Sequence, residues 1–340
     1  MLSWLTIFTL TLAQGVLAGF NPLSTSNVAI YWGQNSYGQG TGSLAQQRLS
    51  TYCANSNIDI IPLAFLLQIN GQGGEPVLNF ANAGNNCTTF SGTNLLNCPQ
   101  LAQDIVTCQK QYGKTILLSV GGATYTEGGF SSSSAAVAGA NLLWNTFGPV
   151  KSGHDRPFGN AVIDGFDFDF ESGVSNMVPF ANQLRSLMNS DKSKTYYLSA
   201  APQCPFPDYA DDPMLSGGVP FDMIFVQFYN NYCGVQSYTP GTSAQNNFNF
   251  NTWDNWAKMT SANKKVKVFL GVPAGPSAAG SGYQSASQLA SVINYSKQFS
   301  SFGGVMAWDA SQAVANSGWL PGVKSDLHGT TAKVGTEFAA

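Results

Sequence analysis

Charged residues are scarce in this chain of 340 residues: 10% are Asp, Glu, Lys or Arg, against about a quarter in an average globular protein. Fifteen basic and 18 acidic residues leave a formal net charge of −3. The longest basic cluster is the short run at 263–267. Nucleic acids and anionic membranes attract dense positive charge. We therefore expect no nucleic-acid partner and no membrane partner, and a neutral ligand such as carbohydrate suits this composition better.

Histidine is also rare, since the sequence contains only His154 and His328, neither at the end of an expected strand. This argues against a Ser-His-Asp triad and against a histidine metal site. The phosphate-binding pattern Gly-x-x-x-x-Gly-Lys-Ser/Thr does not occur in the sequence. We expect no cofactor and no metal.

Long apolar runs are missing except at the N-terminus, where one extends from Leu5 to Val16 and is followed by the small residues Ala18 and Gly19. This pattern indicates a secretory signal peptide over residues 1–18, although the usual positive residues before the apolar run are absent. The alternative, a membrane anchor, needs a longer apolar run. We expect a secreted, extracellular protein, either free in the medium or associated with a cell wall.

Six cysteines agree with secretion, because none of their spacings forms the paired Cys-x-x-Cys of a metal site. We expect three disulfides. Spacing alone leaves their connectivity open, although Cys87 and Cys98 lie in one polar loop and could close it. The triplets that begin at Asn86 and Asn294 are candidate N-glycosylation sites.

Short apolar and β-branched runs alternate with segments of helical pattern. Eight strands are expected, at 28–33, 58–66, 115–120, 162–171, 195–200, 223–229, 266–272 and 304–308. Six helices are expected, at 44–54, 99–112, 135–150, 174–188, 253–262 and 286–299. Continuous apolar strands that alternate with helices predict parallel strands buried on both faces.

This alternation favours an α/β fold, a single-domain (β/α)₈ TIM barrel over residues 19–327, with a C-terminal tail at 328–340. The alternative is an open dinucleotide-binding sheet. That fold needs Gly-x-Gly-x-x-Gly after its first strand, and residues 33–38 do not match it. Residues 70–97 are rich in Gly and Asn, so we expect a long loop there, on the active face. We expect a monomer.

The segment from Asp164 to Glu171 reads Asp-Gly-Phe-Asp-Phe-Asp-Phe-Glu. Because side chains alternate along a strand, Asp167, Asp169 and Glu171 share one face and three phenylalanines share the other. In a barrel the acids point into the lumen and end at the C-terminal mouth, where barrel enzymes carry out their chemistry.

Three stacked carboxyls cannot all ionise cheaply in a poorly solvated interior, so at least one holds its proton toward neutral pH. Glu171 is nearest the mouth and is therefore the expected proton donor. The alternative is a Ca²⁺ or Mg²⁺ site, since clustered carboxylates also bind these ions. No further acidic or amide cluster is evident at a neighbouring strand end.

Polar and aromatic residues also end four other expected strands. A sugar-binding cleft needs such residues, because aromatic rings stack on sugar faces and polar side chains bind sugar hydroxyls. Singly, each could be an ordinary core or turn residue. They are Tyr31, Trp32, Gln34 and Asn35; Ser119, Gly121 and Gly122; Gln227, Tyr229 and Asn230; and Trp308.

These segments, taken with the acidic strand and with residues 303–308, resemble the family 18 glycoside hydrolases. Within that family the chain is similar to the class III, plant-type endochitinases that also occur in fungi. The resemblance covers nearly the whole chain after residue 18. It implies disulfides between Cys53 and Cys108, Cys87 and Cys98, and Cys204 and Cys233. It also implies chitin and chitin oligosaccharides as the substrate.

The family resemblance implies a substrate-assisted, retaining mechanism. Glu171 would protonate the glycosidic oxygen and later act as base toward water. Asp169 would orient the substrate acetamide, whose oxygen attacks the anomeric carbon to give an oxazolinium ion, and Tyr229 would hydrogen-bond that oxygen. Asp167 would lie behind Asp169 and share its proton.

By the same resemblance, Gln227 and Asn230 would border the acetamide pocket and Trp308 would form the floor under the distorted sugar. Two alternatives remain. One is an endo-β-N-acetylglucosaminidase that acts on protein-linked glycans, and the other is a non-catalytic lectin or inhibitor on the same barrel. Such non-catalytic relatives usually lose the terminal acid or its neighbour, and this chain keeps both.

Overall fold

The computed structural model describes residues 19–329. The expected signal peptide at 1–18 lies outside the described residues, as do residues 330–340 of the C-terminal tail expected at 328–340. The first residue of that expected tail, His328, is the last residue of a helix. Within the described range, no helix combines the length and apolar character needed to cross a bilayer.

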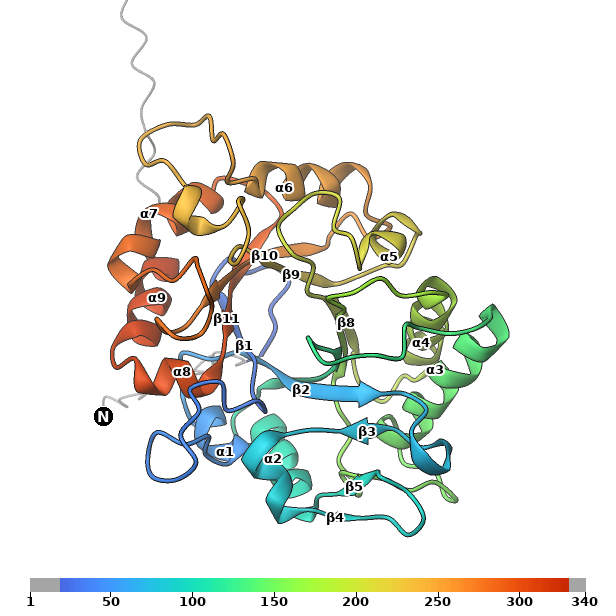
Figure 1. The fold of residues 1–340 in the computed structure, drawn as a ribbon. Helices are drawn as coiled ribbons and strands as arrows, with labels where there is room; N and C mark the ends of the chain where they lie inside the picture. The colour runs from blue at the N-terminus through green and yellow to red at the C-terminus, as the bar shows by residue number, and fades with distance from the viewer. Residues whose placement is uncertain (1–18, 330–340) are drawn as a thin grey trace, which may run out of the picture.

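Eight parallel strands close into a barrel surrounded by helices (Figure 1). Around the barrel, each strand pairs with the next, and the ring closes where Ala29 of the first strand pairs with Ile60 of the second. The barrel strands are β1 (Asn27–Ile30), β2 (Ile60–Gln68), β6 (Thr115–Gly121), β7 (Gly165–Asp169), β8 (Tyr197–Ala200), β9 (Met223–Gln227), β10 (Lys267–Pro273) and β11 (Phe302–Trp308). The (β/α)₈ barrel predicted from the sequence is therefore confirmed.

All six expected helices are present, with shifted ends. They are α1 (Leu49–Cys53), α2 (Pro99–Lys110), α3 (Ser133–Phe147), α4 (Met177–Ser190), α6 (Phe250–Met259) and α7 (Ala286–Ser296). Local sequence explains several starts: α2 has Pro99 at its first turn, and Ser285 with Gln288 forms a capping box at α7.

Three helices were not expected: α5 (Asp212–Ser216), α8 (Ala310–Ala315) and α9 (Trp319–His328). The first two are too short to show a helical period. The third contains Pro321 and Gly322 near its start, which suppress a helical prediction, yet it packs against α7.

The apolar core has two layers separated by the barrel wall. In β7 the phenylalanines face outward: Phe168 packs against Phe180 of α4, with ring centroids 5.7 Å apart. A smaller cluster fills the lumen, where Phe225 meets Phe269 edge to face at 5.1 Å. Phe20 belongs to this inner cluster and packs edge to face on Tyr197. The alternation predicted for the acidic strand is thus present.

Residues 70–97 form the long connection expected after β2, and it contains short elements that the sequence did not predict. It holds β3 (Val77–Leu78), which pairs antiparallel with β2, and a hairpin of β4 (Thr88–Thr89) and β5 (Leu96–Asn97). Two short 3₁₀ helices complete it, η1 (Gln72–Gly74) and η2 (Ala81–Asn86). Strands of two residues leave no periodic signal in a sequence.

Three disulfides join the pairs that the family resemblance implied. Cys53–Cys108 links α1 to α2, and Cys87–Cys98 closes the long connection onto the start of α2. Cys204–Cys233 joins the loop after β8 to the loop after β9. A cross-link between two loops on one rim restricts how far they can separate.

Candidate active site

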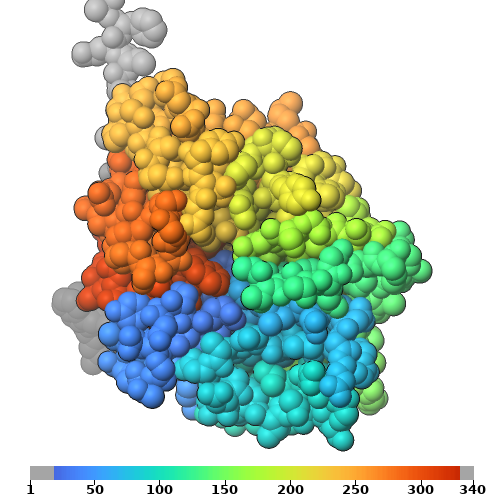
Figure 2. Space-filling model, in the orientation of Figure 1, coloured from blue at the N-terminus to red at the C-terminus, as the bar shows by residue number. Residues whose placement is uncertain are grey.

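The C-terminal ends of the strands surround a hollow. In the space-filling view the surface is recessed near its middle, where the blue, green and orange-red parts of the chain meet (Figure 2). These colours correspond to the segments that follow β1, β6 and β11, so the hollow is the mouth of the barrel. The acidic row of β7 ends at this mouth.

Asp167 is the innermost carboxyl of the row and is fully buried. Its oxygens accept three hydroxyl donors: Tyr31 Oη at 2.7 Å, Ser119 Oγ at 2.6 Å and Ser199 Oγ at 2.6 Å. Burial raises the pKa of Asp167, and the three hydrogen bonds oppose that rise because they favour the ionised form. The lumen therefore contains a carboxyl whose acceptor sites are directed at neighbouring strands.

Asp169 lies one pleat nearer the mouth and is also buried. The Nε2 of Gln227 donates to its Oδ1 at 2.9 Å. Burial raises the pKa of Asp169 well above its usual range, and the charges of Glu171 and Asp167 raise it further. Of the buried pair, Asp169 thus has the stronger tendency to hold a proton near neutral pH. Within residues 19–329, Gln227 is the one side chain that donates to the Asp169 carboxyl.

Glu171 follows β7 at the rim and is exposed, in contrast to the two aspartates. The protein around it still removes part of its hydration, and this raises the pKa of the Glu171 carboxyl above its usual value. A carboxyl at the mouth with a raised pKa can deliver a proton to a bound molecule. Glu171 thus combines a place at the rim with a raised pKa.

Tyr229 stands just beyond β9, and its side chain is 8% exposed. Burial raises the pKa of its phenol well above the usual value, and the charges of Asp169 and Glu171 add to the rise. The phenol accordingly stays protonated over the working pH range and can act as a hydrogen-bond donor. Tyr229 is close enough to Asp169 and Glu171 for their charges to act on its phenol.

An aromatic floor lies beside the acids. Trp308 stacks on Phe65 with ring centroids 5.9 Å apart and an interplanar angle of 20°, and it lies 5.6 Å from Tyr31. Trp308 keeps part of its surface exposed, whereas Phe65 and Tyr31 are buried beneath it. The floor is therefore the partly exposed indole of Trp308, which is supported by the buried rings of Phe65 and Tyr31.

Gly121 and Gly122 hold β6 against this site by close approach. A Cβ on Gly121 would lie 2.2 Å from the carbonyl oxygen of Asp169, and one on Gly122 would lie 2.8 Å from the Phe65 ring. Both glycines have positive φ, and the N–H of Gly122 donates to the Asp169 carbonyl at 2.7 Å. Their lack of side chains lets the backbone of β7 and the aromatic floor reach their places.

Three further expected site residues use their amides to fasten loops. Gln34 Nε2 donates to the carbonyls of Ala64 and Asn79, at 2.8 and 3.1 Å. Asn35 has a positive φ, and its side chain accepts from the N–H of Gln46. Asn230 also has a positive φ, and its Oδ1 accepts from the N–H of Ser281. These contacts shape the rim.

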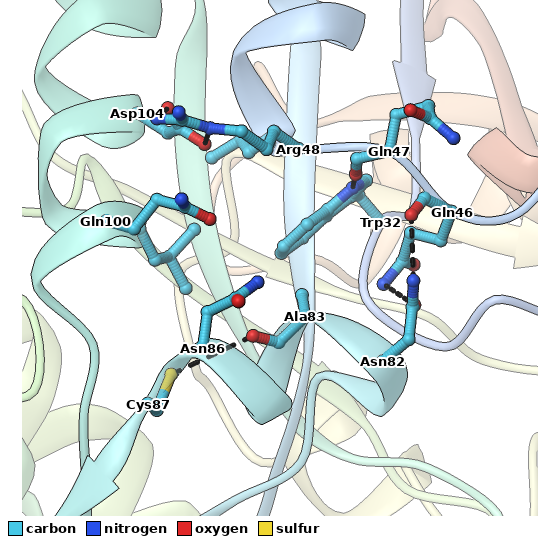
Figure 3. A pocket seen from close by; sticks show the side chains of 12 residues that line it. Trp32, Gln46, Gln47, Arg48, Asn82, Ala83, Asn86, Cys87, Gln100 and Asp104 are labelled. Carbon is cyan, nitrogen blue, oxygen red and sulfur yellow. Dashed lines mark hydrogen bonds and ion pairs between the residues drawn. The ribbon is translucent and has the colours of Figure 1, made fainter. Parts of the chain in front are cut away.

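Trp32 does not face the hollow, so the expectation that it joins the cleft was wrong. Because Tyr31 points into the lumen, its neighbour points outward. The indole is 1% exposed and lines a separate pocket of about 190 Å³ outside the barrel, near the ion pair of Arg48 and Asp104 (Figure 3). Its Nε1 donates to the carbonyl of Gln47.

Sequence reasoning missed several groups near the acids. Ser199 was detectable, because in-register pairing of β7 with β8 sets it beside Asp167. Asp208 and Asp211 gave no signal, since they lie on the loop between β8 and α5. Asp211 is fully buried, and neither of its carboxyl oxygens has a hydrogen-bond partner within residues 19–329. Burial raises the pKa of Asp211 well above its usual range, and Asp208, Asp169 and Asp167 add to the rise.

The cation-site alternative finds no support in the described part of the chain. Within it, no group of three or more His, Cys, Asp or Glu side chains could hold a metal ion. Asp167 is directed at hydroxyl donors, and a Ca²⁺ or Mg²⁺ site would need its oxygens turned toward a shared centre. The arrangement suits proton transfer beside a donor phenol and an open indole.

Comparison with known proteins gives one consistent result. Residues 27–282 match the sequence profile of the family described as glycosyl hydrolases family 18. The chain is 55% identical to a class III chitinase of Arthroderma benhamiae over 93% of its own length and 90% of that protein. It is 54% identical to endochitinase 33 of Trichoderma harzianum, over 91% and 94% of the two chains. Among solved structures, a xylanase and amylase inhibitor protein, XAIP-III, superposes with a TM-score of 0.70 at 33% identity, covering 88% of this chain and 98% of the other.

Proposed function

The chain belongs to the glycosyl hydrolases of family 18 and is a chitinase, and we propose that it cleaves β-1,4 bonds within chitin with Glu171 as proton donor. One observation carries the residue assignment. The acids of β7 run along the barrel from buried Asp167 to exposed Glu171, and Tyr229 and Trp308 lie at the same C-terminal end of the barrel, just after β9 and at the end of β11. No metal or cofactor enters the proposal.

In the first step the Glu171 carboxyl donates its proton to the glycosidic oxygen. The bond from that oxygen to the anomeric carbon breaks while the acetamide oxygen of the same sugar forms a new bond to the carbon. The substrate thereby supplies the nucleophile, as in the substrate-assisted exceptions to the two-carboxylate scheme. The product of this step is an oxazolinium ion and a shortened chain that leaves with a hydroxyl group.

Asp169 and Tyr229 act on the acetamide. The phenol of Tyr229 donates to the acetamide oxygen and orients it toward the anomeric carbon. Asp169 accepts from the acetamide nitrogen. Asp167 shares the proton of Asp169, and this lets the Asp169 carboxylate stabilise the positive charge that develops on the acetamide. Gln227 holds Asp169 in place through its 2.9 Å hydrogen bond, and Asp167 remains behind it as the anchored member of the row.

In the second step the Glu171 carboxylate takes a proton from water. The water oxygen attacks the anomeric carbon, and the bond to the acetamide oxygen breaks. Two displacements at one carbon restore the starting configuration, so the product keeps the β-configuration. Trp308 forms the floor under the reacting sugar, where its open indole face contacts the apolar face of the ring.

An inhibitor of other enzymes is the alternative function, because the inhibitor protein XAIP-III shares the fold at a TM-score of 0.70. A binding role alone does not need buried carboxyls beside a protonated phenol, and burying such groups without a catalytic use costs stability. Asp169, Glu171 and Tyr229 are all present at the C-terminal end of the barrel. We therefore favour the enzyme over an inhibitor or lectin, and over an enzyme of protein-linked glycans.

We also propose that the protein is secreted and acts as a monomer. Three disulfides and a low content of charged residues support an extracellular location. Expression with the natural N-terminus, followed by N-terminal sequencing of protein from the medium, tests the location. A mature protein that begins near residue 19 agrees with the proposal, and retention of the full chain inside the cell contradicts it.

The reaction itself is tested by the anomeric form of the first products. Chitotetraose or a longer oligosaccharide is mixed with the enzyme, and proton NMR follows the new reducing ends within the first minutes. Early β-anomer supports retention and the acetamide mechanism. Early α-anomer means inversion and contradicts it, and the absence of product redirects attention to protein-linked glycans or to binding.

A further inference from the structure

Tyr209 is an exposed aromatic residue on the loop between β8 and α5, and the proposed mechanism does not use it. Its side chain is 83% exposed, while its neighbours Asp208 and Ala210 are buried. A phenol ring that stands in water on a folded loop gains nothing from the core. Such a ring is the type of group that contacts a sugar face in a carbohydrate cleft.

The loop that carries Tyr209 is held by hydrogen bonds and a disulfide. The carboxyl of Asp208 accepts backbone N–H groups from Gln203 at 3.0 Å, from Ala210 at 2.9 Å and from Asp211 at 2.6 Å. The disulfide between Cys204 and Cys233 ties the same loop to the one after β9. Since the backbone is already ordered, a ligand that contacts the ring loses little affinity to loop ordering.

The ring also lies beside the loop of the proton donor. Gly173 is two residues beyond Glu171, and a Cβ built on Gly173 would lie 3.1 Å from the Tyr209 hydroxyl and 3.4 Å from its Cε1. On the inner side of the same loop, the charge of Asp208 is among the causes that raise the pKa of Asp169. Tyr209 thus lies against the rim segment that follows Glu171.

The position of Tyr209 in the barrel order indicates which part of the substrate it meets. Trp308, Phe65 and Tyr31 come from β11, β2 and β1, whereas Glu171 and Tyr209 follow the adjacent strands β7 and β8. The reacting sugar occupies the Trp308 side. A general acid must reach the oxygen of the leaving group, so the leaving sugar lies on the Glu171 side.

From this geometry we infer that Tyr209 is a stacking platform for the departing sugar, on the reducing-end side of the cleaved bond. The inference rests on the proposed function and adds a specificity-determining residue to it. Tyr209 sets how strongly the enzyme prefers substrates that extend beyond the scissile bond. It touches no reacting atom.

The test compares two substrates that differ only beyond the scissile bond. Chitohexaose places sugars on the leaving side, whereas the β-fluoride of N,N′-diacetylchitobiose places a single fluorine atom there. The variants are Tyr209→Ala, Tyr209→Phe, which keeps the ring, and Met259→Ala as a control. Met259 is 78% exposed at the end of α6, where the chain leads back to the opposite face of the barrel.

We expect Tyr209→Ala to lower kcat/KM for chitohexaose about 2- to 12-fold, the scale of one aromatic contact, and to leave kcat/KM for the fluoride unchanged. The site of cleavage in chitohexaose should move toward its reducing end, because fewer sugars are held on the leaving side. Tyr209→Phe should retain most of the wild-type preference, and Met259→Ala should behave as wild type.

Two results would overturn the inference: an equal loss on both substrates, which would mean a structural role, or wild-type kinetics of Tyr209→Ala on chitohexaose. Wild-type enzyme that cleaves neither substrate would instead overturn the proposed function, and this inference with it. The fluoride reaction of the wild type therefore separates the two failures.

Discussion

Replacing Glu171 by Gln removes the ionisable carboxyl, and with it the acidic proton, while it preserves the shape of the side chain. Glu171 is exposed at the rim of the barrel, and substitutions at such positions usually change the free energy of unfolding by less than about 0.5 kcal/mol. We expect Glu171→Gln to fold and to unfold at the wild-type temperature. Any loss of activity can then be assigned to chemistry.

The expected loss is large because a sugar hydroxyl is a poor leaving group without a proton. General acid catalysis contributes about 10²- to 10⁴-fold to rate, which corresponds to about 2.7 to 5.4 kcal/mol of activation free energy. The same substitution acts on Asp169. After burial, the Glu171 charge is the largest cause that raises the pKa of Asp169, so that pKa should fall in the variant.

The assay is the initial rate of chitohexaose cleavage across pH, with Ser172→Ala as a control at the adjacent exposed position. Wild-type kcat/KM should fall as pH rises through the raised pKa of Glu171, because the donor loses its proton. In Glu171→Gln this alkaline limb should vanish from the residual activity. The substrate 2,4-dinitrophenyl chitobioside releases dinitrophenolate, which leaves without a proton. Its kcat/KM should be far less affected than that of chitohexaose.

The reasoning would be refuted by a purified, folded Glu171→Gln enzyme with near-normal turnover of chitohexaose. It would also be refuted by equal losses of kcat/KM on the activated and natural substrates, since kcat/KM reports the first bond cleavage, in which a proton donor matters most for the poorer leaving group. Ser172→Ala should match the wild type on both substrates.

Three further predictions follow from the same geometry. Asp169→Asn should lower kcat by about 10²- to 10³-fold, the usual effect of losing one charge-stabilising group, and wild-type rates on chitohexaose would contradict the role of Asp169. Gly121→Ala places a Cβ 2.2 Å from the Asp169 carbonyl at positive φ and should lower the free energy of unfolding by about 1 to 3 kcal/mol or more. Urea unfolding measures this change. Gly128→Ala is the milder control, because Gly128 also has a positive φ but lies in open space. Asp211→Asn should flatten the pH dependence of stability. The folded state raises the pKa of Asp211, so the wild type loses stability as pH rises above the ordinary value of about 3.9. If the unfolding temperature changes equally between pH 4 and pH 7 in both proteins, Asp211 is not a cause of this pH dependence.

The local order of residues was enough to predict the barrel and its acidic strand. Eight apolar runs that alternate with helical segments require parallel strands covered on both faces, and the two-residue period sets Asp167, Asp169 and Glu171 against three phenylalanines. The same period also implies that Trp32 faces away from the lumen once Tyr31 faces into it. That consequence was available from the sequence and was missed.

Only the tertiary structure decided how these groups meet. The hydroxyls around Asp167 come from β1, β6 and β8, and strand register, which depends on closure of the whole barrel, brings them to one carboxyl. Phe65 supports Trp308 across two strands that are far apart in sequence. Asp208, Tyr209 and Asp211 are brought close to the β7 segment by a loop, and a loop has no period from which its path can be predicted. Periodicity determines which face a residue takes on its own strand, whereas contacts between distant segments depend on closure and packing.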